Sequence, residues 1–242
     1  MWHIDLNCDL GEGCGNDKLL MPFISSCSIA CGGHFGTAKT IATAIELAKA
    51  HGVLVGPHPS YPDIAHFGRR TIDMPLQSLQ AALREQLRLF FKQCPDPHHI
   101  KAHGALYNDL FTDIEKADAV TEVFAEFAKG IKLYCAPGSQ LAMVAAQKGF
   151  QVVYEAFADR AYLSDGTLAP RAMSDAVLSD NHVIAKRVVN LIKNKTITTI
   201  TGAIMPLTAQ TICLHGDGAD VVAHAAFLSH SLKQNNIHVQ GL

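Results

Sequence analysis

Short apolar runs alternate along the chain with longer segments in which apolar residues recur every three or four positions. The short runs have the length, about 4 to 7 residues, that is usual for buried strands. The longer segments, such as 76–93, place their apolar residues on one face of a helix. The predicted strands are 4–9, 26–31, 53–58, 100–103, 132–136, 152–157 and 211–215. The predicted helices are 37–51, 76–93, 113–129, 139–148, 174–194 and 219–233.

This alternation predicts a parallel sheet with right-handed crossovers, which fits both an open Rossmann sheet and a closed or nearly closed barrel. The glycine motifs GxGxxG and GxxxxGK[ST], which bind nucleotides in open-sheet folds, are missing. Polar residues instead follow at least four strands, as they do on the active face of a β/α barrel. These residues are Asp9, His34, His58, His103 and His215. We therefore predict an α/β protein, a β/α barrel of about seven strands.

The chain shows no linker, repeat or low-complexity segment, so we expect residues 1–242 to form a single domain. The stretch 196–207 interrupts the alternation in the C-terminal third and is predicted to be an inserted β-hairpin. Hydrophobic residues make up 48% of the chain and charged residues 17%, which is enough apolar material for a large core.

A formal net charge of −2 provides no electrostatic reason to expect a nucleic acid or an anionic membrane as partner. No leader or membrane-spanning run is recognisable, so we expect a cytoplasmic protein with a small ligand. The seven cysteines show neither CxxC nor a zinc-ribbon spacing and are expected to be reduced and mostly buried.

The first strand carries polar residues at a period of two. Asp5, Asn7 and Asp9 would share one face of it and point into the barrel. Buried acids need cations, hydrogen-bond donors or a ligand, and Asp5 has the simpler alternative role of bracing neighbouring loops. The glycines on both sides of Glu12 form a flexible turn that would let this residue approach a ligand.

Two further motifs place histidines at strand ends. His34 lies in CGGHFG directly before a predicted helix, and His58 lies between two prolines in GPHPSYPD. A rigidly placed histidine at a strand end favours function over packing. In FGRR, Arg69 or Arg70 would hold a carboxylate or phosphate, or would form a surface salt bridge.

The motifs KAHGALYN and CLHGDG add a lysine and two more histidines. Lys101 and His103 have the spacing of one strand face, and a lysine inside a barrel is expected to pair with a carboxylate such as Asp9. His215 ends an apolar strand, and Asp217 follows it closely. These two residues would act as a base and its orienting acid, or would only cap the next helix.

Six motifs occur in a fixed order: DLNCDLGEG, ISSxxIACG, GxHPxYPD with FGRR, HGALYN, EAFADRAYxxDGxLxPR and ICxHGD. From about Ile4 to Asp217 the chain resembles the LamB/YcsF family of 5-oxoprolinase A subunits. The resemblance implies a barrel of the glycoside hydrolase/deacetylase type. It also implies ATP-dependent opening of 5-oxoproline, or a related small lactam, to glutamate together with two partner subunits, with ATP as co-substrate.

The resemblance implies site residues at the matching positions: Asp9, Glu12, His34, His58, Lys101, His103, His215 and Asp217. The chain also departs from the family pattern. Where the family typically reads CGFHAGDP, this chain reads CGGHFGTA, so an aromatic residue has moved from Gly33 to Phe35 and an acid is replaced by Thr37. Ala102 also stands where the family has proline. We expect these differences to affect the substrate more than the fold.

Lactam hydrolysis needs an activated carbonyl, a water, a base and a proton donor for the leaving nitrogen. The expected base is Asp9 or His215. His34 and His58 would orient water or phosphate, and Lys101 would bind an oxyanion or carboxylate. The expected substrate-binding residues are Asn7, Glu12, His103, Arg70 and Asp217.

Two alternatives stay open. Asp9, His34 and His58 would supply the ligands of a divalent metal in a deacetylase-like hydrolase. The second alternative is a noncatalytic scaffold that binds a small acid, because the acid of the family motif is missing at Thr37. A homo-oligomer is compatible with either.

Overall fold

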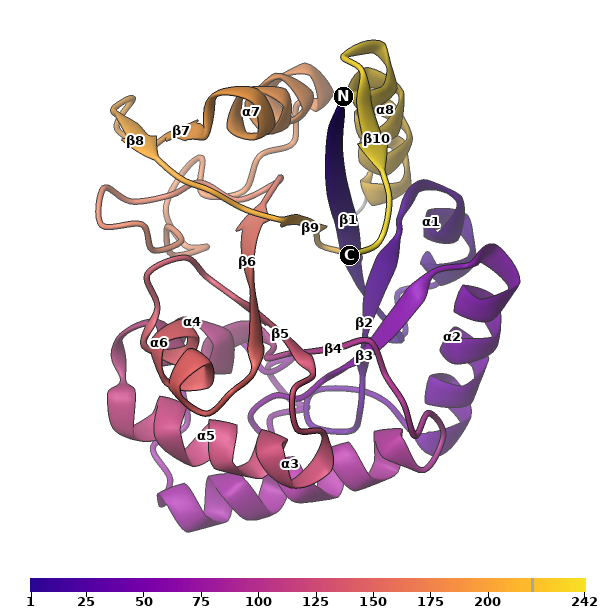
Figure 1. Ribbon diagram of the computed structural model, residues 1–242, viewed down its shortest axis with the longest axis vertical. Helices are drawn as coiled ribbons and strands as arrows, with labels where there is room; N and C mark the ends of the chain where they lie inside the picture. The colour runs from indigo at the N-terminus through magenta and orange to yellow at the C-terminus, as the bar shows by residue number, and fades with distance from the viewer. Residues whose placement is uncertain (219) are drawn as a thin grey trace.

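Seven parallel strands form a nearly closed barrel in the computed structural model, which describes residues 1–218 and 220–242 (Figure 1). The strand order β3-β2-β1-β9-β6-β5-β4 is the order of a sheet that curls round on itself. The two outer strands also meet, because the backbone N–H groups of His98 and His103 donate to the carbonyls of Val55 and Pro59, both at 2.9 Å. The predicted barrel of about seven strands is confirmed. The strands are β1 (Trp2–Leu10), β2 (Ser26–Ala30), β3 (Leu54–His58), β4 (His99–Lys101), β5 (Lys132–Cys135), β6 (Gln151–Phe157) and β9 (Thr211–Leu214).

Helices cover the outside of the barrel, as Figure 1 shows for α2, α3 and α5. The apolar stripe of α3 is buried at Leu79, Leu83, Leu87 and Phe90, as its periodicity indicates. The helices are α1 (Asp17–Leu20), α2 (Ala38–His51), α3 (Leu76–Phe91), α4 (Gly104–Thr112), α5 (Ile114–Phe127), α6 (Gln140–Gln147), α7 (Asn181–Asn194) and α8 (Val221–Gln234), with a 3₁₀ turn at Met21–Phe23.

The predicted hairpin is present as the antiparallel pair of β7 (Thr196–Thr198) and β8 (Ile204–Pro206). One further strand, β10 (Ile237–Val239), pairs in parallel with the start of β1 and was not expected from the sequence. A run of three residues carries almost no periodicity, so only the neighbouring chain defines it as a strand.

Two helix starts differ from those expected, and helix α4 was not expected at all. Helix α7 begins at Asn181 and not at position 174. The Asp180 side chain accepts hydrogen bonds from two N–H groups in the first turn of the helix and so fixes its start. Helix α4 was not predicted, since it begins at Gly104 immediately after β4 without a polar loop. Ala219, the predicted start of the last helix, lies outside the described residues, and α8 begins at Val221.

The two faces of β1 differ in chemistry. Leu6, Cys8 and Leu10 are buried in the hydrophobic core, whereas Asn7 and Asp9 make polar contacts across the barrel. The interior is therefore lined by polar groups that must satisfy one another or a ligand.

Asp5 braces the lower part of this interior. Its carboxylate accepts hydrogen bonds from the hydroxyls of Ser25 (2.6 Å), Ser26 (2.7 Å), Thr211 (2.6 Å) and Tyr134 (3.0 Å). Four donors saturate its oxygens, so the bracing role of Asp5 is the one that the structure supports.

All seven cysteines are free thiols, and Cys8, Cys27, Cys31, Cys135 and Cys213 are buried, as expected. Among the described residues, no helix has both the length and the apolar character needed to cross a membrane.

Candidate active site

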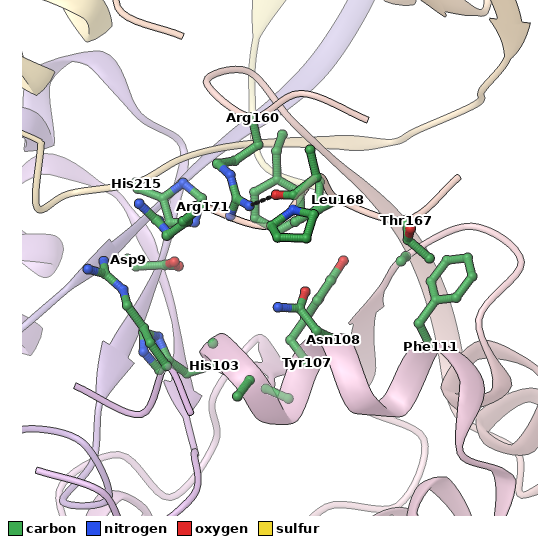
Figure 2. A pocket seen from close by; sticks show the side chains of 18 of the residues that line it. Asp9, His103, Tyr107, Asn108, Phe111, Arg160, Thr167, Leu168, Arg171 and His215 are labelled. Atoms are coloured by element: carbon green, nitrogen blue, oxygen red, sulfur yellow. Dashed lines mark hydrogen bonds between the residues drawn. The ribbon is translucent and has the colours of Figure 1, made fainter. Parts of the chain in front are cut away.

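A cavity of about 670 Å³ opens at the C-terminal ends of the barrel strands (Figure 2). Asp9, His58, Lys101, His103 and His215 line it, and they lie at the ends of four strands, β1, β3, β4 and β9. The convergence of strand-end side chains that the sequence predicts is therefore present.

Lys101 is fully buried and holds three acidic or amide partners together. Its Nζ lies 2.7 Å from Asp9 Oδ1, 3.0 Å from Asn7 Oδ1 and 2.9 Å from Glu155 Oε1. Burial alone would lower the pKa of Lys101, but the charges of Asp9, Cys213 and Glu155 raise it well above its usual value. The side chain is therefore a fixed ammonium ion.

Asp9 is ionised for the converse reason. Burial alone would raise its pKa, but the charges of His58 and Lys101 hold the pKa of Asp9 well below its usual value. Its Oδ2 lies 3.3 Å from Nε2 of His58.

His58 and His103 each turn one ring nitrogen toward the other. His58 Nδ1 donates to the Lys101 carbonyl and His103 Nε2 donates to the Phe67 carbonyl, both at 2.9 Å, because a carbonyl can only accept. The other two ring nitrogens lie 3.0 Å apart. This contact is a hydrogen bond when one of these two nitrogens carries a proton, and without that proton the two lone pairs could bind a cation.

Glu12 and His34 form a second short contact, between a carboxyl group and a ring nitrogen, beside that of His58 and His103. Glu12 Oε1 lies 2.9 Å from His34 Nε2 and 3.5 Å from His103 Nδ1. His34 Nδ1 faces the Ser60 hydroxyl at 3.0 Å, and that hydroxyl donates its own proton to the Tyr61 carbonyl. His34 Nδ1 is therefore the donor, and its Nε2 is an acceptor.

The protonation states fit this arrangement. Burial, followed by the charge of Asp9, raises the pKa of Glu12 to about 8. Burial lowers the pKa of His34 and of His103 well below the usual value for histidine. Neutral Glu12 can thus donate its proton to neutral His34 near pH 7.

The same donor atoms fit a divalent cation. Within each of two overlapping sets, Asp9 with His58 and His103, and Glu12 with His34 and His103, the ligand atoms lie within 4.8 Å of one another. Imidazole and carboxylate donors suit Zn²⁺ and its first-row neighbours. The convergence of these ring nitrogens and carboxylate oxygens is the feature of this structure that favours an ion.

His215 is oriented by a residue other than the expected one. Its Nδ1 lies 3.0 Å from both carboxylate oxygens of Asp159, whereas Asp217 pairs with Arg69. Burial alone would raise the pKa of Asp159, but the charge and hydrogen bond of His215 lower it. Within the described residues Nε2 of His215 has no hydrogen-bond partner, and the side chain lines the cavity.

The ten predicted site residues thus fall into two groups. Seven form one connected network at the inner end of the cavity: Asn7, Asp9, Glu12, His34, His58, Lys101 and His103. His215 and Arg70 lie on the cavity wall, and Asp217 reaches that wall only through Arg69.

Sequence reasoning missed several residues of the cavity and its support, above all Glu155, Asp159, Arg160 and Arg171. A signal existed for Glu155, because it is the only acid in the otherwise apolar and aromatic strand β6. All four belong to the motif EAFADRAYxxDGxLxPR, which supports the family resemblance but from which no site residue was predicted.

Thr37 lies away from the network. Its hydroxyl accepts a hydrogen bond from the Thr40 N–H while the Thr40 hydroxyl accepts one from the Thr37 N–H, so the pair caps α2. An aspartate at this position would do the same. The missing acid is therefore a helix cap, and its absence no longer favours a noncatalytic scaffold.

Comparisons with known proteins identify the family of the chain. The 5-oxoprolinase A subunit of Clostridium beijerinckii is 38% identical over 248 residues, which cover 99% of this chain and 97% of the relative. That of Limosilactobacillus fermentum is 37% identical, with 99% of both chains covered. The crystal structure of a lactam utilization protein from Thermus thermophilus matches over 100% of both chains, with a TM-score of 0.90 and 35% identity. The LamB/YcsF family model matches residues 4–242, and the chain belongs to the LamB/YcsF family.

Proposed function

We propose that this chain is the A subunit of a 5-oxoprolinase, which opens 5-oxoproline to L-glutamate in an ATP-dependent reaction with two partner subunits. The names of its relatives support the reaction class. The observation that carries the catalytic role concerns His215, which lines the cavity: Asp159 holds its Nδ1, and its Nε2 has no hydrogen-bond partner among residues 1–218 and 220–242.

In this proposal ATP is used on a partner subunit, since the chain carries no glycine-rich phosphate-binding motif. The partner transfers the terminal phosphoryl group of ATP to the lactam oxygen and releases ADP. In the cavity of this chain, water adds to the ring carbon, the ring C–N bond breaks, and the nitrogen gains a proton. A second water then releases phosphate from the resulting acyl phosphate, which leaves glutamate.

His215 is the proposed general base for the first water. Histidine performs this role most often near neutral pH, and an acid that holds Nδ1 fixes the ring so that Nε2 accepts the proton. Asp9 is less suited to it, because the low pKa of this carboxylate makes it a weak base.

Lys101 has a different role from the expected one. Its ammonium group already donates hydrogen bonds to Asn7, Glu155 and the Cys213 sulfur and forms an ion pair with Asp9. We therefore assign Lys101 to positioning Asp9 and keeping it ionised, and an oxyanion must find other donors in the cavity.

A metal-dependent hydrolase of the deacetylase type is the second candidate, favoured by the converging donors on Asp9, His58 and His103. A bound divalent cation would polarise a carbonyl or lower the pKa of a water. Its test is the metal content of protein purified without chelator, by inductively coupled plasma mass spectrometry. About one zinc or manganese ion per chain, lost in His103→Gln, would support it, and metal-free active protein would oppose it.

The proposed function is tested by release of glutamate from 5-oxoproline and ATP. We expect release only when the chain is combined with its partner subunits. His215→Asn should lower the rate by about 100-fold or more, which is the usual contribution of a general base. Arg84→Gln, at an exposed ion pair with Glu126 on the outer helices, is the matched control and should leave the rate unchanged. Equal rates for both variants would remove His215 from the mechanism.

A further inference from the structure

The cavity concentrates positive charge in a chain whose formal net charge is −2. The basic side chains on its wall are Arg69, Arg70, Lys101, Arg160 and Arg171, and the only acidic one among the described residues is Asp9. Low-dielectric walls focus such a field, so the cavity attracts anions.

Two of these charges are neutralised within the protein. Lys101 contacts Asp9 and Glu155, and Arg69 pairs with Asp217. In the part of the chain that the structure describes, neither Arg70 nor Arg171 has an ion pair or a side-chain hydrogen bond.

Arg160 is fixed in place without being neutralised. Its guanidinium donates to the backbone carbonyls of Ala169 (2.6 Å) and Ala176 (3.4 Å), and the residue is 5% exposed. These bonds orient the group and leave its charge uncompensated. A preoriented guanidinium loses little conformational freedom when an anion binds.

The arginines also act on one another. Burial, followed by the charge of Arg171, lowers the pKa of Arg160 to about 10, and burial with the charge of Arg69 lowers the pKa of Arg171. Guanidinium groups that repel one another beside a cavity are stabilised when an anion joins them.

Figure 2 shows where this anion would lie relative to the chemistry. Arg160 and Arg171 lie on the same wall as His215, and Tyr107 and Asn108 from α4 face them across the cavity. A small ligand between these walls would place one group at the arginines and another at the proposed base.

We propose that Arg160 and Arg171 form a subsite for a phosphoryl group, so that the ligand of this cavity is a phosphorylated small molecule delivered by a preceding phosphoryl-transfer reaction. The identity of that molecule as a phosphorylated lactam rests on the proposed function. The subsite itself rests on two guanidinium groups that have no ion pair among the described residues, and two such groups match a dianionic phosphoryl group better than one carboxylate.

The test is binding of inorganic phosphate to the full chain, measured by isothermal titration calorimetry at constant ionic strength. Arg171→Gln should weaken phosphate binding by about ten-fold or more, the loss expected for one charge-assisted hydrogen bond. Arg84→Gln, far from the cavity on α3, should bind phosphate like the wild type. Arg171 makes no ion pair or side-chain hydrogen bond within the described residues, so its replacement should leave the fold intact, which thermal unfolding checks.

Two results would overturn the subsite. One is phosphate binding that is absent, or equal in Arg171→Gln and Arg84→Gln. The other is an equal loss for phosphate and for 5-oxoproline in Arg171→Gln, which would define a carboxylate site instead. These titrations need no partner subunit or turnover, so their failure is distinguishable from a failure of glutamate release.

Discussion

At the scale of single residues, the inner end of the cavity is a set of charges that depend on one another. Lys101 keeps its charge because the carboxylates of Asp9 and Glu155 form ion pairs with it. Asp9 keeps its charge because Lys101 and His58 lie beside it. A buried pair of this kind is strongly destabilised when only one partner is removed.

Glu155→Gln tests this dependence. The glutamate is fully buried, and its Oε1 contacts Lys101 Nζ and Asn7 Nδ2, both at 2.9 Å. Loss of its charge should lower the free energy of unfolding by about 3 kcal/mol, measured by urea denaturation. Glu126→Gln, which breaks the exposed pair with Arg84, should have a much smaller effect. Equal effects would mean that the buried network contributes no more than a surface pair.

Asp159 provides a pH-dependent prediction. The charge and hydrogen bond of His215, with the charge of Arg171, lower its pKa despite burial. Its folded pKa lies below the unfolded value of about 3.9, so ionised Asp159 stabilises the fold above that pH. The contribution disappears as the pH falls through the folded pKa.

Thermal unfolding of Asp159→Asn should therefore show a lower melting temperature than the wild type at pH 7, and the difference should shrink below about pH 4. A difference that stays constant from about pH 7 to about pH 3 would show that the carboxylate charge does not stabilise the fold.

Residue pairing is also where sequence reasoning reaches its limit. The pairing of Lys101 with Asp9 could be predicted because a lysine inside a barrel needs an acid. The partner of His215 could not, because Asp217 is two positions away in sequence whereas Asp159 is 56 positions away. Only the neighbouring position of β6 and β9 in the sheet brings Asp159 to the histidine.

At the scale of elements, α4 connects the fold with the site. It begins at Gly104 directly after β4 and carries Tyr107 and Asn108 on the cavity wall. Its start depends on a left-handed backbone, with φ of 58° at Gly104. The motif HGALYN was recognised as functional from the sequence, but the helix was not, because no polar loop separates it from the strand.

Gly104→Ala should disturb the cavity as well as the fold. A Cβ there would lie 2.5 Å from the Gly68 carbonyl oxygen, so the backbone at the start of α4 would have to move. Gly52→Ala is the control, because Gly52 has a similar φ of 68° with open space around it. We expect both variants to lose stability, and only Gly104→Ala to lose phosphate binding and glutamate release. If Gly52→Ala lost phosphate binding and glutamate release as much as Gly104→Ala, backbone strain alone would explain the loss.

At the scale of the whole molecule, the barrel brings chemistry from several strand ends to one cavity. This much could be predicted, because apolar runs define the strands and polar residues follow them. The charge distribution could not be predicted, since a net charge near zero conceals a cavity wall with four arginines. Two of them belong to the segment after β6, which contains no long helix or strand that periodicity would reveal.

The central claim is that this chain performs the hydrolytic half of an ATP-driven lactam opening, with His215 as base. The most direct measurement is the ratio of glutamate to ADP formed from 5-oxoproline and ATP by the reconstituted subunits. With the wild-type chain, the account predicts one glutamate for each ADP. With His215→Asn, it predicts that ADP forms while glutamate falls by about 100-fold or more. Glutamate released at the wild-type ratio by His215→Asn, or by the partner subunits alone, would contradict it.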